Sequence, residues 1–203
     1  MYALLYLKDI DVQVRKERAQ QEAANRDPLT GVYNRNAFQE AMLRYMDDSG
    51  ELGRGALILL DIDNFKEIND RFGHLEGDAA LRYVTKVIQA TFRRKDLVGR
   101  LGGDEFAVLL PRCNLRDAAR VLEKIRAVFR HYNEHSGNVP VIMSFGLSGA
   151  EEAPSLREAL ALADCRMLHE KHGSRLVSGH AIKAWIEKRK DCVVSLEESR
   201  YDG

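Results

Sequence analysis

The chain has 203 residues, of which 45% are hydrophobic and 31% are charged, a composition typical of one globular domain with helical extensions. Basic and acidic residues number 31 each, so no overall positive charge indicates binding to a nucleic-acid polymer. Three distant cysteines without a CxxC pair argue against a disulfide framework and favour a cytoplasmic protein. No apolar run is long enough for a membrane segment, although a longer parent protein could be membrane-anchored.

Residues 1–26 precede the globular part of the sequence. The apolar run at 1–8 predicts a short strand, and the charged stretch at 11–26 predicts a polar helix. A strand followed by such a helix resembles the exit of a PAS sensor domain, which would make this segment a strand remnant and a signalling helix. The helix has too few apolar residues to fold alone, so it is either solvated or paired with its twin in a dimer.

Apolar side chains at helical spacing predict helices around Phe38, Val84, Ile125 and Ala163. Strands are predicted at 56–60, 96–101, 106–110 and 139–147, and the glycine-led turn between the second and third predicts a β-hairpin. Strands alternating with helices indicate an α/β or α+β fold. Residues 179–203 predict a C-terminal extension, either a short helix around Trp185 that packs back on the domain or a disordered tail.

The first candidate site follows the apolar strand, where Asp61, Ile62 and Asp63 stand in succession. Alternation along a strand places the two aspartates on one face, and carboxylates at a strand end are ligands that Mg²⁺ takes alongside phosphates. Asp63 could instead cap the following helix.

The second candidate site is the hairpin turn Gly102-Gly103-Asp104-Glu105. Paired glycines let the backbone approach a phosphate closely, and the two acids supply further carboxylates. Clustered carboxylates repel one another unless a cation lies between them, so two such clusters in one domain favour a shared divalent ion. From the residues alone, the sequence predicts a metal–phosphate site.

Gly102-Gly103-Asp104-Glu105-Phe106 is the signature of the GGDEF diguanylate cyclases, and three further motifs stand in the order and spacing of that family. The segment at 27–35 resembles DxLTxLxNR, the segment at 61–70 matches DxDxFKxxND, and the segment at 73–78 matches GHxxGD. The resemblance implies a domain at 27–178 with a palm-like nucleotide-cyclase fold, a central and mainly antiparallel sheet flanked by helices. The implied activity is Mg²⁺-dependent condensation of two GTP into cyclic di-GMP in a homodimer, with Mn²⁺ able to substitute.

The resemblance also assigns roles to matching positions. Metal ligands would be Asp61, the carbonyl of Ile62, and Asp104, with Glu105 either a further metal ligand or a carboxylate beside the ligands. The catalytic acids would be Asp104 and Glu105. The remaining GTP-binding residues would be Phe65, Lys66, Asn69, His74, Asp78, Gly102, Gly103, Lys171 and Arg175. Asp78 favours guanine, because a carboxylate accepts from guanine N1–H and N2–H₂ together.

The last pair of these residues lies where the sequence departs from the family pattern. The family has ADxALYxAKxxGRN, whereas this chain has Leu168 for the tyrosine, Glu170 for an alanine and a glycine one position early, at Gly173. Lys171 and Arg175 could therefore bind phosphates or simply be cations near the end of a helix.

Arg93 and Asp96 match the RxxD site at which the family binds its own product as an inhibitor. The arginine fork suits guanine and phosphate, while the carboxylate can accept from the guanine edge. The implied partners are GTP, cyclic di-GMP, a second copy of the chain and an upstream sensor domain. The alternative function is a non-catalytic domain that senses GTP or cyclic di-GMP.

Overall fold

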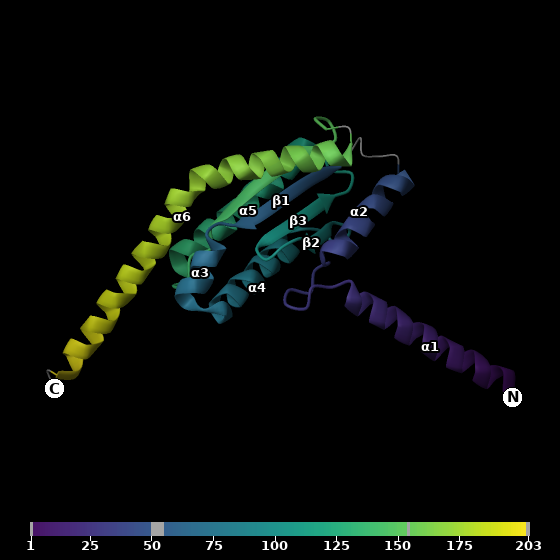
Figure 1. The fold of residues 1–203 in the computed structure, drawn as a ribbon, viewed down its shortest axis with the longest axis horizontal. Coiled ribbons are helices and arrows are strands. Elements are labelled where there is room, and N and C mark those ends of the chain that lie inside the picture. Colours follow the sequence, from purple (N-terminus) through teal and green to yellow (C-terminus); the bar gives the residue numbers. More distant parts are fainter. Residues whose placement is uncertain (1, 50–54, 154, 202–203) are drawn as a thin grey trace.

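The computed structural model describes residues 2–49, 55–153 and 155–201, without the side chains at 2–11, 18, 46–49, 175–176 and 188–201. Its sheet has helices on both faces, which confirms the α+β fold expected from the pattern of apolar residues (Figure 1). In chain order the elements are α1 (Tyr2–Ala24), α2 (Arg35–Ser49), β1 (Ala56–Ile62), α3 (Phe65–Phe72), α4 (His74–Thr91), β2 (Leu97–Arg100), β3 (Glu105–Leu110), α5 (Leu115–His135), β4 (Met143–Gly149) and α6 (Leu156–Tyr201).

The four described strands form an antiparallel sheet in the order β2-β3-β1-β4. β2 and β3 are adjacent and antiparallel, which confirms the predicted hairpin. β1 lies between β3 and β4, and Asp61 near its end pairs with Glu105 on one side and Ser144 on the other. Residues directly opposite each other in such a pair share one face of the sheet. The register therefore brings the two acid clusters of the sequence to one end of the sheet.

Alternation along β1 divides its buried side chains between two cores. Ile58, Leu60 and Ile62 face a large core built with α4 and α5, while Leu57 and Leu59 face a smaller core built with α2 and α6. All residues of β1 are buried, so the strand that contains Asp61, and that Asp63 directly follows, is covered on both sides. Asp61 continues the face that α6 covers.

The prediction of a strand at residues 1–8 is wrong, because residues 2–8 belong to α1. The run contains alanine and leucines, which are good helix formers, and has no β-branched residue before Ile10. No glycine or proline separates it from the charged stretch, so one helix continues through both. The resemblance to a PAS exit is consequently not supported. Figure 1 shows α1 projecting away from the sheet.

The C-terminal segment continues α6 rather than forming a separate short helix. Gly173 lies inside α6 and does not have the positive φ that commonly ends a helix. The extension packs back on the domain: Ile182 is 2% exposed, and the rings of Trp185 and Phe72 meet edge to face at 5.1 Å. Within the described parts of the chain, every helix is too short or too polar to span a membrane.

Candidate active site

Asp61 is a buried carboxylate near the end of β1. Its side chain is 4% exposed, and Oδ1 accepts a hydrogen bond from Lys171 Nζ at 2.6 Å. Burial raises the pKa of Asp61 to about 6; the hydrogen bond from Lys171 opposes this rise, and the nearby charge of Asp104 adds to it. The protein alone therefore compensates the ionised form of Asp61 incompletely.

Asp63 is also buried, and it accepts hydrogen bonds from the hydroxyls of Ser144 at 2.7 Å and Ser174 at 2.5 Å. Burial raises the pKa of Asp63, while these two hydrogen bonds act in the opposite direction. The N-cap residue of α3 is Asn64 rather than Asp63. Asp63 thus joins β1 to β4 and α6, which is a structural role that the sequence did not indicate.

Asp104 lies beside the end of β1, where its carbonyl oxygen accepts a hydrogen bond from the Ile62 N–H at 3.2 Å. A cation near Asp61 and Asp104 would relieve the repulsion between the two carboxylates. Among the described residues, no group of three or more His, Cys, Asp or Glu side chains could hold a metal ion. A divalent cation at this place would need further donors beside these two carboxylates, such as a main-chain oxygen, phosphate oxygens and water.

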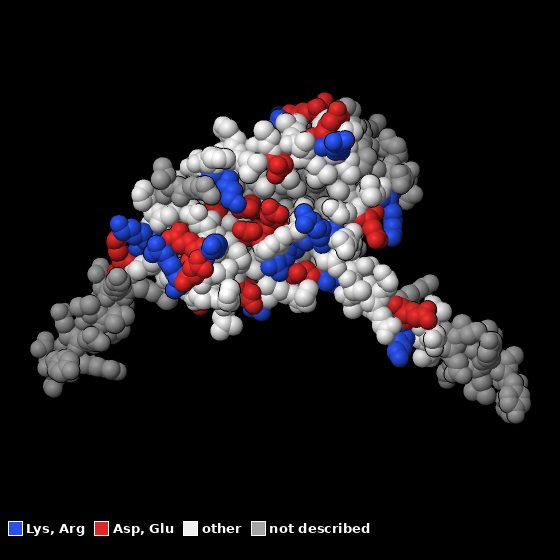
Figure 2. Space-filling model, in the orientation of Figure 1, with Lys and Arg blue, Asp and Glu red and all other residues white. Residues whose placement is uncertain are grey.

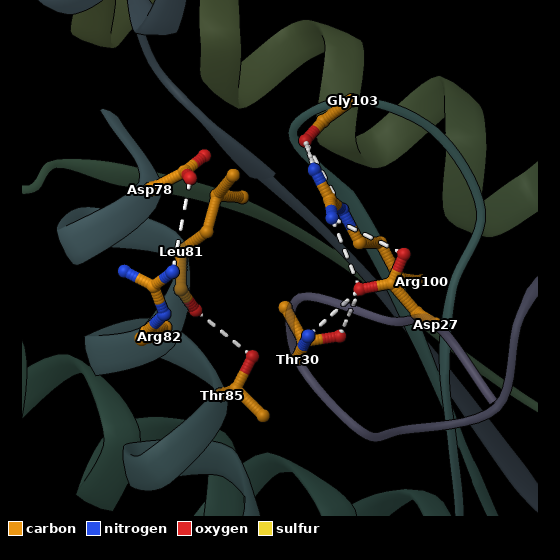
Figure 3. Close-up of polar contacts among 8 residues, drawn as sticks. All are labelled: Asp27, Thr30, Asp78, Leu81, Arg82, Thr85, Arg100 and Gly103. Carbon is orange, nitrogen blue, oxygen red and sulfur yellow. Dashed lines mark hydrogen bonds and ion pairs between the residues drawn. The ribbon is translucent and has the colours of Figure 1, made fainter. Parts of the chain in front are cut away.

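Arg100 holds the turn at Gly103, the residue before Asp104, and Figure 3 shows its contacts to Gly103 and Asp27. Its Nη1 donates to both carboxylate oxygens of Asp27, at 3.0 and 3.2 Å, and its Nη2 donates to the Gly103 carbonyl at 2.7 Å. Asp27 also accepts from the Thr30 N–H at 2.9 Å and from the Thr30 hydroxyl at 2.5 Å. Burial acts to raise the pKa of Asp27, but these hydrogen bonds outweigh it and hold the pKa below its ordinary value.

The two glycines of the turn leave one side of it open. Neither Gly102 nor Gly103 has a positive φ, so the backbone conformation alone does not require glycine. A Cβ at Gly103 would meet nothing within 4 Å, whereas one at Gly102 would lie 2.8 Å from a carboxylate oxygen of Glu105. A ligand therefore has room to approach the backbone at Gly103.

A cavity of about 520 Å³ adjoins Asp104, a size that suits a small ligand. The predicted phosphate-binding residues Lys66 and Lys171 both line it, so two cations face the same space as Asp104. The side chain of Arg175 lies outside the described residues. The lining consists of Asn64, Phe65, Lys66, Glu67, Asp70, Arg71, Asp104 and Lys171.

The residues predicted to contact guanine lie at the junction of α3 and α4. Asn69 packs against Gly77, where a Cβ would fall only 2.1 Å from Asn69 Oδ1, so glycine is needed for this close approach. Asp78 follows Gly77 directly and forms an exposed ion pair with Arg82 at 3.8 Å (Figure 3). His74, the first residue of α4, is exposed. The contact at Gly77 therefore places Asn69 against the helical turn that contains Asp78.

Glu105 lines a different cavity, of about 410 Å³, together with Arg35 and Asp164 among others. It shares a face of the sheet with Asp61 by register, but it does not line the cavity that contains Asp104 and the two lysines. The two acids of the turn are thus directed toward neighbouring spaces.

The predicted product site also lies on a cavity. Arg93 and Asp96 line a space of about 350 Å³ with Arg26, Tyr33 and Arg94 among others. The Asp96 carboxylate accepts a hydrogen bond from the Arg93 N–H at 2.7 Å, which fixes the short turn between them.

Sequence reasoning missed Arg100 and the serines of α6, because their partners are distant in the chain. A signal was present: Lys171, Ser174 and Ser178 are spaced three and four apart, so they lie on one face of a helix. That face meets the end of β1 and the two residues just beyond it, through contacts to Asp61, Asp63 and Asn64 respectively.

Charged side chains of both signs share the molecular face drawn in Figure 2. Acidic side chains gather near its centre, and basic side chains border them. This local mixture agrees with the net charge of zero: cations are placed around an acidic centre instead of covering a whole face.

The sequence matches the family model described as "Diguanylate cyclase, GGDEF domain" over residues 24–176. The chain is 35% identical over 162 residues to diguanylate cyclase DgcP of Pseudomonas aeruginosa, which covers 77% of this chain and 24% of that protein. It is 33% identical over 178 residues to diguanylate cyclase DgcM of Escherichia coli, which covers 85% of this chain and 42% of that protein. The chain thus spans less than half the length of these curated relatives.

The solved structures that resemble this chain include members of the same family. Diguanylate cyclase SiaD of Pseudomonas aeruginosa, solved in complex with its activator SiaC, matches with a TM-score of 0.67 and 32% identity over 84% of this chain and 67% of that chain. The coiled coil and GGDEF domain of DgcB from Caulobacter crescentus, solved in complex with c-di-GMP, matches with a TM-score of 0.67 and 29% identity over 85% of this chain and 95% of that chain. The chain therefore belongs to the family of GGDEF-domain diguanylate cyclases.

Proposed function

We propose that this chain condenses two GTP molecules into cyclic di-GMP and releases two pyrophosphates. The observation that supports this most directly is the convergence of Asp61, Asp104 and Lys171 beside a cavity of about 520 Å³. Acids for a cation and lysines for phosphates are the groups that phosphoryl transfer requires. The family and its named cyclases support the same activity.

Each of these residues has a defined part in the proposed reaction. Asp61, the Ile62 carbonyl and Asp104 would hold a divalent cation, Mg²⁺ or in its place Mn²⁺, which when bound would neutralise phosphate charge and lower the pKa of the attacking 3′-hydroxyl. Lys66 and Lys171 bind the phosphates. Lys171 exchanges part of its contact with Asp61 for a phosphate oxygen, which keeps a cation beside the buried acid.

The guanine would lie against α3 and α4, between Phe65, Asn69 and Asp78. Asp78 exchanges its exposed ion pair with Arg82 for the N1–H and N2–H₂ groups of guanine; such exposed pairs contribute little, so the exchange costs little. His74 contacts the nucleotide from the start of α4. This arrangement favours guanine over adenine, which has no donor at N1.

Cyclic di-GMP contains two phosphodiester bonds, so two protomers, each with one GTP, would face each other. Each 3′-hydroxyl attacks the α-phosphate of the GTP on the partner, and pyrophosphate leaves each time. A monomer then binds GTP without turning it over. Glu105 would lie near the reacting groups rather than in the phosphate cavity, because it lines the neighbouring space.

The test is incubation of the purified chain with GTP and Mg²⁺ over a range of protein concentrations. We expect cyclic di-GMP and pyrophosphate in a ratio of one to two, with specific activity rising with protein concentration. Asp104→Ala, which removes a cation ligand, is the control. Product no greater than that of the control, with GTP binding retained, would instead identify a non-catalytic sensor.

We further propose that Arg93 and Asp96 bind cyclic di-GMP and inhibit the enzyme. The cavity of about 350 Å³ beside them supports this, since it presents a guanidinium and a carboxylate together. Arg93→Ala should raise the product concentration needed for half inhibition about tenfold and leave the initial rate unchanged. Lys86→Ala, an exposed cation on α4 outside this cavity, is the matched control.

A further inference from the structure

Ser178 lies beyond residue 176, where the match to the family ends, yet it contacts the candidate active site. Its hydroxyl accepts a hydrogen bond from Asn64 Nδ2 at 2.7 Å, and the residue is 1% exposed. The two residues are 114 positions apart in the sequence. This contact exists because α6 continues past Gly173, so that its next turns lie over the end of β1.

Asn64, the residue immediately before α3, has an unusual backbone conformation. Its φ of 56° and ψ of 30° are left-handed, a conformation that glycine adopts freely and asparagine adopts more often than most other residues. Its carbonyl accepts the hydrogen bond from the Ile68 N–H at 3.1 Å that begins α3. Asn64, Phe65 and Lys66 all line the cavity beside Asp104. The conformation of Asn64 therefore sets the direction in which Phe65 and Lys66 enter the cavity.

The extension of α6 is held in place one turn and more beyond Ser178. Ile182 is buried in the large core, and the Trp185 ring packs on Phe72 at the end of α3. Trp185 Nε1 also donates to the Gly137 carbonyl at 3.1 Å. Since the same stretch of α6 contacts the residue before α3 and the residue that ends it, it fixes both ends of this short helix.

We propose that Ser178 is a positioning residue for the nucleotide: its hydroxyl holds the Asn64 side chain and thereby the start of α3. Ser178 does not touch the substrate. The inference rests on the proposed function, because it concerns the binding of GTP in the same cavity. Loss of the hydroxyl should weaken ground-state and transition-state binding alike, so KM rises while kcat changes little.

The experiment compares Ser178→Ala with Ser148→Ala. Ser148 is an equally buried serine whose hydroxyl donates to the Ala159 carbonyl of α6 at 2.8 Å, outside the lining of the cavity beside Asp104. We expect Ser178→Ala to raise KM for GTP about three- to tenfold, because one buried hydrogen bond is lost, and to change kcat by no more than about twofold. Ser148→Ala should leave KM unchanged, although both variants lower the melting temperature.

Asn64→Gly provides a second, independent measurement. Glycine adopts the left-handed conformation without assistance, so Ser178→Ala should have no further effect on KM in this background. An unchanged KM in Ser178→Ala, or an equal rise in Ser148→Ala, would overturn the inference.

Binding of a GTP analogue with a methylene bridge between the α- and β-phosphates is measured by calorimetry for the same proteins. If the wild-type chain makes no cyclic di-GMP, the proposed catalysis fails, and the calorimetric affinities still decide the role of Ser178. A weaker affinity in Ser178→Ala alone supports positioning, and equal affinities in all variants refute it.

Discussion

Asp27 is half-buried and Asp61 is buried, and the pKa values of these two aspartates shift in opposite directions. Asp27 receives hydrogen bonds from Thr30, and Arg100 Nη1 donates to both of its carboxylate oxygens, so its pKa falls below the ordinary value. Asp61 receives one hydrogen bond from Lys171 and lies beside Asp104, and its pKa rises to about 6. Both lie near the same hairpin turn, yet only Asp27 is fully compensated by the protein.

This difference distinguishes Asp27, which stabilises the turn, from Asp61, which we propose binds the cation. Asp27 is held ionised so that Arg100 can fix the Gly103 carbonyl and the turn. Asp61 is left with excess negative charge nearby, which a divalent cation would neutralise. A stable turn next to an uncompensated acid is what a preorganised cation site requires.

The largest expected effect is that of Asp61→Asn. It removes a proposed cation ligand, so cyclase activity should fall at least about 100-fold, or about 3 kcal/mol of transition-state stabilisation. Without divalent ions at pH 7.5, unfolding free energy should not fall, because a poorly compensated buried charge disappears. Activity is measured by product formation and stability by denaturant titration. Retained activity would remove Asp61 from the site.

Asp27→Asn should lower stability and have a smaller effect on activity, the reverse of Asp61→Asn. Loss of the charge leaves Arg100 without its ionised partner, so unfolding free energy should fall by about 1–3 kcal/mol. Activity should fall less than in Asp61→Asn, since the cation ligands remain. Arg100→Met combined with Asp27→Asn should cost less than the sum of the single changes. Simple additivity in denaturant titrations would show that the pair does not act as a unit.

The smallest effect is a difference in the pH dependence of stability, measured as melting temperatures without divalent ions between pH 3 and 8. The raised pKa of Asp61 means that its contribution is present below about pH 4 and is lost as pH rises through about 6. The lowered pKa of Asp27 means that its contribution is present above its ordinary value of 3.8 and is lost as pH falls through the lowered value.

At each pH, the melting temperature of a variant is subtracted from that of the wild type. This difference isolates the contribution of the substituted aspartate. The difference for Asp61→Asn should decline from pH 4 to 6 and then level. The difference for Asp27→Asn should be level above pH 4 and decline below it. Parallel differences would mean that the two aspartates have similar surroundings.

Local patterns predicted most of the fold. The apolar run before Asp61 gave β1, and helical spacing around Val84 and Ile125 gave α4 and α5. The errors lie at the two ends of the chain. A short apolar run at 1–8 fits either a strand or a helix, and only continuity with the residues that follow decides between them. The segment around Trp185 was expected to form a separate short helix or a disordered tail, but it continues α6 past Gly173, and tertiary contacts of Ile182 and Trp185 stabilise that part of the helix.

The candidate site was predictable where motifs name the residues and not where long-range contacts support them. The motifs gave Asp61, Asp104 and Lys66, which the structure brings around one cavity edge. Arg100 and Ser178 act through partners that are 73 and 114 positions away, and no local pattern specifies such contacts. Glu105 shows a further limit, since adjacency to Asp104 in sequence did not place it in the same cavity.

The position of β1 between β3 and β4 has a consequence for how the protein folds. Both neighbours of β1 come much later in the chain, and Asp61 receives its pairing partners only from them. Contacts of such long range form slowly, because large loops must close first. A partly folded or newly emerging chain would therefore contain every motif and still have no nucleotide site. Binding of the nucleotide would therefore report that the whole sheet has formed.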